Sequence, residues 1–555
     1  MKIHKRITSG IHLLMASSAL FFTGCGDSLL DSLNENIEII EGGGSVAQTV
    51  DQASGMFLEA QALVHDTREH KYQYQFNLHI DNYAGYLCAP NDFSGKLTST
   101  YFFNKDFASG PRANFFWVAE QTLPVMKGAK DLDLEEIGAM SSILYCYSAQ
   151  ELVDIHGPFP WWDYKCQKQN PPLTYYKVED IYDSIFTDLK KAADILKNYT
   201  ATPAEHQILI EDILSSKDRL CGGKVDLWRK FANSLRLRLA MHISTANPEK
   251  AKAEAMAALN DGVLEEGDPN VAYNVSLYGG YNPLEFISRS WQDTRLNASF
   301  ENLLKRLQSP LLETWFSKNS GEICDMNGKL VLAKDEKIVG MRAGTLTLPR
   351  DNTSNFYKNF SPINTKYSFA PVYLMKVSEV LFLQAEAALR WEITSADPFY
   401  WYDGGIYRSF KDENLTDEAY EQYSLVEIPE NIDYVDYHDN YNNAKGLVTI
   451  GVAWSDDDSK EVKLEKIITQ KYIANFPMSL EAWTDLRRTG FPKIFPVVWD
   501  DGDGTIPEGD IIRRMPYLIN DDSDKEDVLN SAIPALGGGD YQGTRLWWDT
   551  GILFN

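Results

Sequence analysis

Apolar residues recur every three or four positions in several segments of the chain, a spacing typical of amphipathic α-helices. Residues 177–198 show it most clearly, because one stripe of this segment carries Ile181, Ile185, Phe186, Leu189, Ala192 and Leu196. Similar patterns predict helices over residues 46–65, 134–155, 226–245, 248–259, 374–391, 461–476 and 480–489. An amphipathic helix buries its apolar face, so these segments are expected to pack against one another around a shared core.

Turn and capping residues separate the predicted helices. Asn247 is placed to cap the helix that begins at Pro248, and Gly262 follows its last turn. Gly157 and Pro158 end the helix over residues 134–155. Short helix pairs of this kind favour a tetratricopeptide-like scaffold, although no clean sequence repeat is present.

Two regions depart from the helical pattern. Residues 447–452 have the composition of a short strand. Residues 391–443 are rich in Tyr, Trp, Asp and Gly and have weak periodicity, which predicts a long irregular insertion. The predicted fold class is therefore mainly α, a tetratricopeptide-like helical-pair scaffold with long irregular, aromatic-rich insertions and a few short strands.

The amino-terminal segment has the order of a secretory signal: basic residues, an apolar run over residues 11–22, and small residues. The run is too short to span a bilayer comfortably. Because the segment ends on Gly24-Cys25, it resembles a bacterial lipoprotein signal, with Phe22 where leucine is usual. We predict a lipoprotein signal peptide over residues 1–24, an acylated Cys25 with a flexible tether over residues 25–45, and one exported domain over residues 46–555. An ordinary signal with a coincidental cysteine is the alternative.

The chain is acidic, with 79 Asp and Glu against 53 Lys and Arg and a net charge of -26. Such a chain repels phosphate backbones, which argues against nucleic acid as a partner. The cysteines after Cys25 are odd in number and widely spaced, unlike a zinc site or a dense disulfide framework. We expect mostly buried thiols at these five positions: Cys88, Cys146, Cys166, Cys221 and Cys324.

Several charged residues allow both a chemical and a structural interpretation. Glu379 and Glu386 share one helix face and could act as a glycosidase acid–base pair, but we favour burial against arginines such as Arg236 or Arg238. We likewise expect the pairs 487–488 and 513–514 to meet nearby acids rather than an acidic ligand.

Metal sites are not predicted. His156 has no neighbouring ligands in the sequence, so a capping or packing role is expected. The acidic run that begins at Asp500 lacks the glycine of an EF-hand loop, since Ile506 occupies that position counted from Asp501. No cofactor motif is present either, and the glycine runs lack the context for phosphate binding.

Aromatic residues beside short polar groups are the candidate ligand site. Sugar rings present C–H faces that stack on Trp and Tyr, while Asn, Asp and Arg bind the hydroxyls. Three clusters have this composition: Tyr83, Tyr86, Asn91, Asp92 and Phe93; Tyr281, Asn282, Trp291 and Asp293; and Trp401, Tyr402 and Asp403. Core packing is the alternative for any single one of these aromatic residues.

Several segments together resemble the SusD/RagB family of nutrient-binding lipoproteins. The carriers are residues 72–78, 81–86, the helix from Trp228 to Met241, residues 378–390, 470–474, 481–490, 513–517 and 546–549, all in the family's order. The likeness spans nearly the whole mature chain. It departs at Trp161, where the family more often has tyrosine, and residues 391–443 cannot be aligned.

The resemblance implies a tetratricopeptide-like scaffold tethered by lipid to the outer membrane and facing the cell exterior. It also implies capture of oligosaccharides, or of peptides in some branches, and their delivery to a TonB-dependent (SusC-like) outer-membrane transporter without catalysis. Two alternatives stay open: a surface glycoside hydrolase, and a peptide-binding or adhesin lipoprotein.

Overall fold

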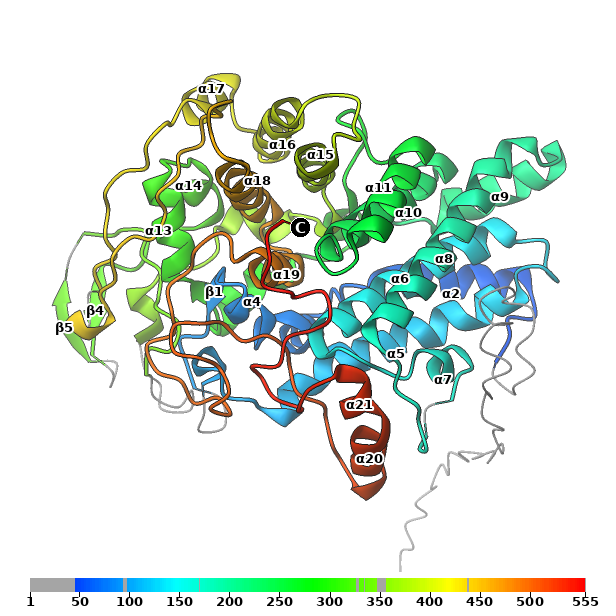
Figure 1. Cartoon of the computed structure of the whole chain (residues 1–555), viewed down its shortest axis with the longest axis horizontal. Helices are drawn as coiled ribbons and strands as arrows, with labels where there is room; N and C mark the ends of the chain where they lie inside the picture. Colours follow the sequence, from blue (N-terminus) through cyan, green and yellow to red (C-terminus); the bar gives the residue numbers. More distant parts are fainter. Residues whose placement is uncertain are drawn as a thin grey trace, which may run out of the picture.

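A group of helices forms one side of the molecule (Figure 1). These helices are α2 (Val50–Leu63), α5 (Lys105–Gly128), α6 (Glu135–His156), α7 (Trp161–Lys165), α8 (Val178–Asn198), α9 (Ala204–Lys217), α10 (Val225–His242) and α11 (Pro248–Asp261). Helix α5 packs on α2 and α6, and the series continues from α6 to α8, α10 and α11. The mainly helical fold class is confirmed, and the tetratricopeptide-like pairing stays a prediction.

The computed structural model describes residues 45–92, 97–168, 170–325, 329–333, 335–346, 356–436 and 439–554. The predicted signal peptide, Cys25 and nearly all of the tether lie outside these residues, and so does Phe93. Within the described part of the chain, no helix is both long enough and apolar enough to cross a membrane.

A second group of helices lies beside the first. It consists of α13 (Ala298–Arg306), α14 (Leu311–Trp315), α15 (Val377–Trp391), α16 (Pro398–Asp412), α17 (Asp417–Ser424), α18 (Lys460–Asn475) and α19 (Ser479–Thr489). Short helices fill the connections: α3 (Glu69–Tyr72), α4 (Ile80–Tyr83), α12 (Pro283–Phe286), α20 (Asp522–Asp527) and α21 (Ile533–Leu536). Figure 1 shows α20 and α21 below the main body.

The remaining elements are short turns and strands. Single helical turns are η1 (Gln73–Asn77), η2 (Thr98–Thr100), η3 (Tyr199–Ala201), η4 (Val275–Tyr278), η5 (Ile287–Trp291), η6 (Phe356–Asn359), η7 (Thr365–Phe369), η8 (Asn440–Asn442) and η9 (Val528–Ala532). The strands form antiparallel pairs: β1 (Leu87–Cys88) with β3 (Arg295–Leu296), β2 (Val271–Tyr273) with β6 (Val372–Met375), and β4 (Glu322–Cys324) with β5 (Leu330–Ala333).

Helix α15 joins the two helical groups because it is apolar around most of its circumference. Val380 and Leu383 pack into the core formed with α2, α6, α8 and α10. Phe382 and Ala385 pack into the other core, with α16, α18 and α19. A helix that is apolar on opposite sides is expected to be buried between layers, as α15 is.

The eight predicted helices are all present, with small shifts at their ends. In α11 the Asn247 side chain accepts a hydrogen bond from the Lys250 amide, and Gly262 follows the helix with a φ of 92°. The helix predicted from residue 374 begins only at Val377, because Leu374 belongs to β6. Four of the cysteines, Cys88, Cys146, Cys221 and Cys324, are free buried thiols, as expected.

The strand predicted over residues 447–452 is wrong. Its backbone groups are satisfied without a strand ladder: the Val448 carbonyl accepts bonds of 3.1 and 2.9 Å from the Arg306 guanidinium, and the Val452 amide donates to the Val426 carbonyl. Hydrogen bonds to a side chain and to a single distant carbonyl therefore replace pairing with a neighbouring strand.

The irregular insertion predicted over residues 391–443 is partly wrong, since it contains α16 and α17. Asp397 caps α16, and Tyr402, Ile406 and Phe410 form its buried stripe. Gly404 and Gly405 lower its intrinsic helix propensity, but Gly405 is needed for packing. An added Cβ at Gly405 would lie 2.7 Å from the Phe382 ring, so a glycine at this position allows α16 to pack closely on α15.

Candidate functional site

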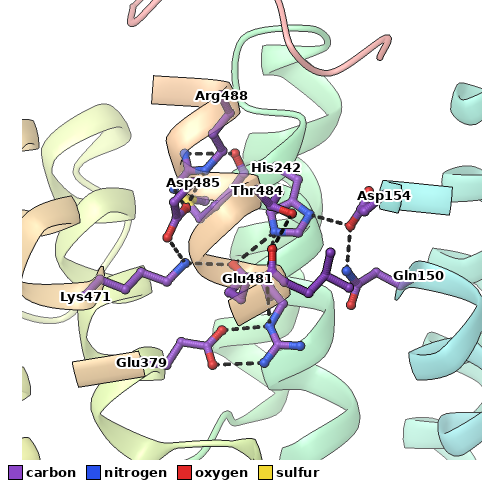
Figure 2. Close-up of polar contacts among 12 residues, drawn as sticks. Gln150, Asp154, His242, Glu379, Lys471, Glu481, Thr484, Asp485 and Arg488 are labelled. Carbon is purple, nitrogen blue, oxygen red and sulfur yellow. Dashed lines mark hydrogen bonds and ion pairs between the residues drawn. The ribbon is translucent and has the colours of Figure 1, made fainter. Parts of the chain in front are cut away.

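The carboxylates Glu379 and Glu386 on α15 are both fully buried in ion pairs. Glu379 accepts bonds of 2.7 and 2.9 Å from Arg238 (Figure 2). Glu386 accepts two bonds of 2.7 Å from Arg488 and one of 2.8 Å from Arg390. Both side chains are 0% exposed, which confirms burial against arginines. Arg238 is one of the two expected partners, whereas Arg236 pairs with Glu254 instead. Because both α15 carboxylates are buried, a bound ligand would not reach them, and they are not placed to act as an acid–base pair.

His242 extends this network from α10 to α6 and α19. Its Nε2 atom lies 3.1 Å from the Glu481 carboxylate, and its Nδ1 atom lies 3.4 Å from Asp154 (Figure 2). Burial opposes a charge on His242, but Glu481 and Asp154 outweigh it and raise its pKa to about 9. Lys471 adds a second positive charge, 2.9 Å from Glu481 and 3.1 Å from Asp485. This buried ion network thus ties α6, α10, α15, α18 and α19 together.

A small cleft borders the buried ion network but has no room for a ligand of ordinary size. His65, Tyr72 and Tyr147 line it, together with Glu151, which lies 2.7 Å from His65. Its volume is about 30 Å³. Because one water molecule needs roughly 10–15 Å³ by this measure, the cleft suits one or two waters.

The paired arginines have mainly structural partners, as expected. Arg488 also lies 2.7 Å from Asp485, Arg513 binds Asp549 at 3.3 Å, and Arg514 binds Asp540 at 2.6 Å. Arg487 differs, because it donates to the backbone carbonyls of residues 154 and 513. Its guanidinium lies 3.6 Å from the Trp483 ring centroid and 4.7 Å from that of Trp548.

The residues considered as metal ligands have local partners. The Nδ1 atom of His156 lies 3.0 Å from the Met515 carbonyl, which supports the packing role. Asp503 accepts bonds from the backbone amides of Thr505 and Gln542, so it orders its own loop. In the described ranges, no group of His, Cys, Asp and Glu side chains is arranged to hold a metal ion.

The first aromatic cluster lies mostly in the core. Tyr83 and Tyr86 are 1% and 0% exposed. The Tyr83 ring packs 5.3 Å from Trp483, and the Tyr86 hydroxyl donates to the Tyr472 carbonyl. Because both rings are buried, they offer no face on which a ligand could stack, and neither belongs to the candidate site.

The polar members of the first cluster lie beside the second cluster. The Asn91 side chain donates a 3.2 Å bond to the Gln292 carbonyl. Asp92 is 8% exposed. The pairing of β1 with β3 brings these two parts of the sequence together.

The second cluster contains an exposed aromatic platform. Tyr281 is 41% exposed and stacks 5.1 Å from Phe286, which meets the edge of Trp291 at 5.7 Å. Asn282 and Asp293 are buried instead: Asn282 caps α12, and Asp293 accepts a 2.9 Å bond from Gln73. Only Tyr281 and Trp291 of this cluster therefore present aromatic surface.

The third cluster lies on α16 and lines an open groove. One wall carries the rings of Phe399, Tyr400, Trp401 and Tyr407. The other wall is the end of α11 and the loop over residues 262–267, and α15 lies at its base. We call this the α16 groove. Tyr402 points away from it, since it is 2% exposed and its hydroxyl donates to the Val452 carbonyl at 2.7 Å.

The size and chemistry of the α16 groove suit a small-molecule or oligomeric ligand. Its volume is about 850 Å³, within the usual 300–1,000 Å³ of ligand sites. Phe399 and Tyr400 are 46% and 58% exposed, and the Tyr400 ring meets Trp401 at 5.0 Å. Gln384, Asn260 and Asp403 supply short polar groups beside these rings.

Comparison with known proteins identifies the family. The SusD-like family model, described as Susd and RagB outer membrane lipoprotein, matches residues 34–549, so the chain belongs to this family. No curated protein matches the chain in sequence.

Solved structures agree with this assignment. A chitin-binding SusD homolog from Flavobacterium johnsoniae is 28% identical, with a TM-score of 0.79 over 90% of this chain and 99% of that chain. A SusD homolog from Bacteroides vulgatus is 29% identical, with a TM-score of 0.78 over 90% and 98%. The sequence-based family assignment is confirmed.

Sequence reasoning missed most of the α16 groove. The run from Phe399 to Trp401, just after the helix-starting Pro398, was the available signal for its aromatic wall. Tyr407 lies two turns further along, where helical spacing would have found it if α16 had been predicted. The opposite wall has no such signal, because residues 259–267 are brought to α16 by tertiary contacts, among them the bond from Arg408 of α16 to the Glu266 carbonyl.

Proposed function

We propose that this protein captures oligosaccharides and that the α16 groove is its binding site. The single observation that carries the site is a groove of about 850 Å³ with exposed aromatic rings beside short polar groups. Family membership and the chitin-binding relative support the ligand class. Ring faces of Phe399 and Tyr400 would stack on sugar C–H faces, and Asn260 and Gln384 would bind hydroxyls.

Binding of a panel of purified oligosaccharides, measured by isothermal titration calorimetry, tests this function. Tyr400→Ala removes an exposed ring from the groove, and we expect it to weaken binding about 10-fold or more, as loss of a stacking partner does. The matched control is Tyr441→Ala, since Tyr441 is 75% exposed and lies outside the groove lining. Equal affinity of both variants and the unchanged protein would overturn the site assignment.

The same incubations address the alternatives. Binding without product release supports a capture protein, whereas glycan turnover would make the chain a hydrolase. Failure to bind any glycan together with binding of peptides would favour the peptide-binding or adhesin alternative. If glycans bind and Tyr281→Ala rather than Tyr400→Ala abolishes the binding, the aromatic platform of Tyr281 and Trp291 is the site.

Anchoring and delivery complete the proposal. Cys25 would be acylated after removal of residues 1–24, and residues 25–45 would tether one domain, residues 46–555, to the outer membrane, facing the cell exterior. The family description as an outer membrane lipoprotein supports this. Labelling cells with a palmitate analogue tests the anchor: label should be incorporated and should disappear in Cys25→Ala.

Delivery requires a partner, for which we propose a TonB-dependent, SusC-like transporter. Affinity purification of the lipoprotein from detergent-solubilised outer membranes should recover an outer-membrane barrel of that class. Recovery of the lipoprotein alone under conditions that preserve other membrane complexes would contradict the proposal.

A further inference from the structure

The polar lining of the α16 groove is strongly one-sided in charge. Its carboxylates are Glu265, Glu266, Asp397 and Asp403, and none of the described residues that line it is Lys or Arg. Four acidic groups around one concave surface attract cations and repel anions, because the concave shape concentrates their field. The charge of the groove therefore bears directly on which oligosaccharides it can hold.

Nearby cations cancel only part of this charge. Lys230 lies 3.0 Å from Glu265, but it also lies 2.9 Å from Asp268, which is outside the groove lining. Arg408 donates to the backbone carbonyls of Glu266 and Asp268, and its guanidinium lies 2.9 Å from Asp412. Each cation thus already has a carboxylate partner.

Among the residues that the structure describes, the other three carboxylates of the groove form no ion pair. Asp397 accepts a hydrogen bond from the Tyr400 amide as the cap of α16, and Asp403 accepts one of 2.6 Å from the Tyr420 hydroxyl. Glu266 is exposed and has no ion pair within the described ranges. The amino-terminal dipole of α16 stabilises Asp397 but offsets only about half an elementary charge.

The aromatic wall, like the carboxylates, favours ligands that carry positive charge. The faces of Phe399, Tyr400 and Trp401 carry negative quadrupole potential, which attracts an ammonium group as well as sugar C–H bonds. A protonated amino sugar could therefore use both walls of the groove, whereas a carboxylate or sulfate group would face repulsion from both.

On this basis, and resting on the proposed function, we infer that the α16 groove selects oligosaccharides that are neutral or carry protonated amines and rejects uronic and sulfated ones. Amine-bearing oligomers should bind most tightly, because they add attraction to Glu266, Asp397 and Asp403. Neutral oligomers should bind by stacking on the aromatic rings, without this added attraction.

Three hexasaccharides of different charge test this selectivity by calorimetry at pH 6: N-acetylated chitohexaose, its fully deacetylated counterpart and hexagalacturonic acid. We expect the deacetylated oligomer to bind at least about 5-fold more tightly than chitohexaose in about 0.02 M salt. The advantage should shrink in about 0.5 M salt, where screening is strong. Hexagalacturonic acid should show no binding.

Charge-neutral variants separate this effect from folding and from stacking. Glu266→Gln combined with Asp397→Asn removes two carboxylates, and asparagine retains the capping function at position 397. We expect the double variant to lower the affinity for the deacetylated oligomer far more than the affinity for chitohexaose, so that most of the advantage of the deacetylated oligomer is lost. The control is Glu249→Gln, because Glu249 lies at the start of α11, about 15 Å from the end of this helix that borders the groove.

The outcomes distinguish this inference from the proposed function. Chitohexaose binding as tightly as its deacetylated counterpart, with no response to the double variant, would overturn charge selection and leave oligosaccharide capture intact. Binding of hexagalacturonic acid more tightly than chitohexaose would also overturn charge selection. If a wider glycan panel binds nowhere on the protein, the proposed function fails and the inference fails with it.

Discussion

The Arg238 guanidinium and the Glu379 carboxylate meet through two hydrogen bonds of 2.7 and 2.9 Å, with side-chain exposures of 2% and 0%. The pair joins α10 to α15, two helices about 140 residues apart in the sequence. Each charge is costly to bury alone, so each requires the other.

Removing one member of this pair should destabilise the fold strongly. We expect Glu379→Gln to lower the free energy of unfolding by about 3–5 kcal/mol, because it leaves Arg238 buried without its main counter-charge. Urea denaturation followed by circular dichroism measures this. The double variant Arg238→Met with Glu379→Met should recover part of the loss, and a double variant no better than Glu379→Gln would contradict the explanation.

His242 should make stability depend on pH above neutrality. Its pKa in the folded protein is raised to about 9 from an ordinary value of 6.5. The charged ring therefore stabilises the fold fully below about pH 6.5, and this contribution is lost as the pH rises through about 9. The difference in unfolding free energy between the unchanged protein and His242→Gln should thus be largest near pH 6 and small near pH 10. A difference that does not change with pH would argue against a protonated His242.

Two other histidines should make stability fall in acid. Burial lowers the pKa of His79 and of His156 to about 3. Below pH 6.5 the unfolded chain takes up protons on these rings that the folded chain excludes. Each ring therefore lowers the free energy of unfolding by about 1.4 kcal/mol per pH unit down to about pH 3. His79→Phe should reduce the slope of unfolding free energy against pH in this range. An unchanged slope would show that His79 is not buried as a neutral ring.

The two neighbouring glycines of α16 should respond in opposite ways to alanine. Gly405→Ala places a methyl group 2.7 Å from the Phe382 ring and should cost about 1–3 kcal/mol of stability. The Gly404 position has its nearest neighbour 3.9 Å away, so Gly404→Ala should be neutral or should stabilise α16 by up to about 1 kcal/mol. Thermal denaturation of the two variants compares them directly, and equal melting temperatures would refute the close packing of α15 on α16.

Features that depend on neighbouring residues could be predicted from the sequence, and features that depend on distant contacts could not. The stripe of α8 and the Asn247 cap of α11 depend on neighbours within one or two turns, and both were predicted. Helix α5 was not, because Pro111 and Pro124 lie inside it. Its path depends on contacts with α2 and α6, which compensate for the two missing amide donors.

The amino-acid sequence by itself determined the helical class of this protein, the order of its main helices and its family. Those properties come from apolar periodicity, capping residues and motif order, all of which are local along the chain. Only the tertiary structure decided which arginines Glu379 and Glu386 meet, that Tyr83 and Tyr86 are core residues, and that the aromatic face of α16 is open opposite α11. These relationships join residues far apart in sequence, and which face of an aromatic residue is covered depends on what packs against it.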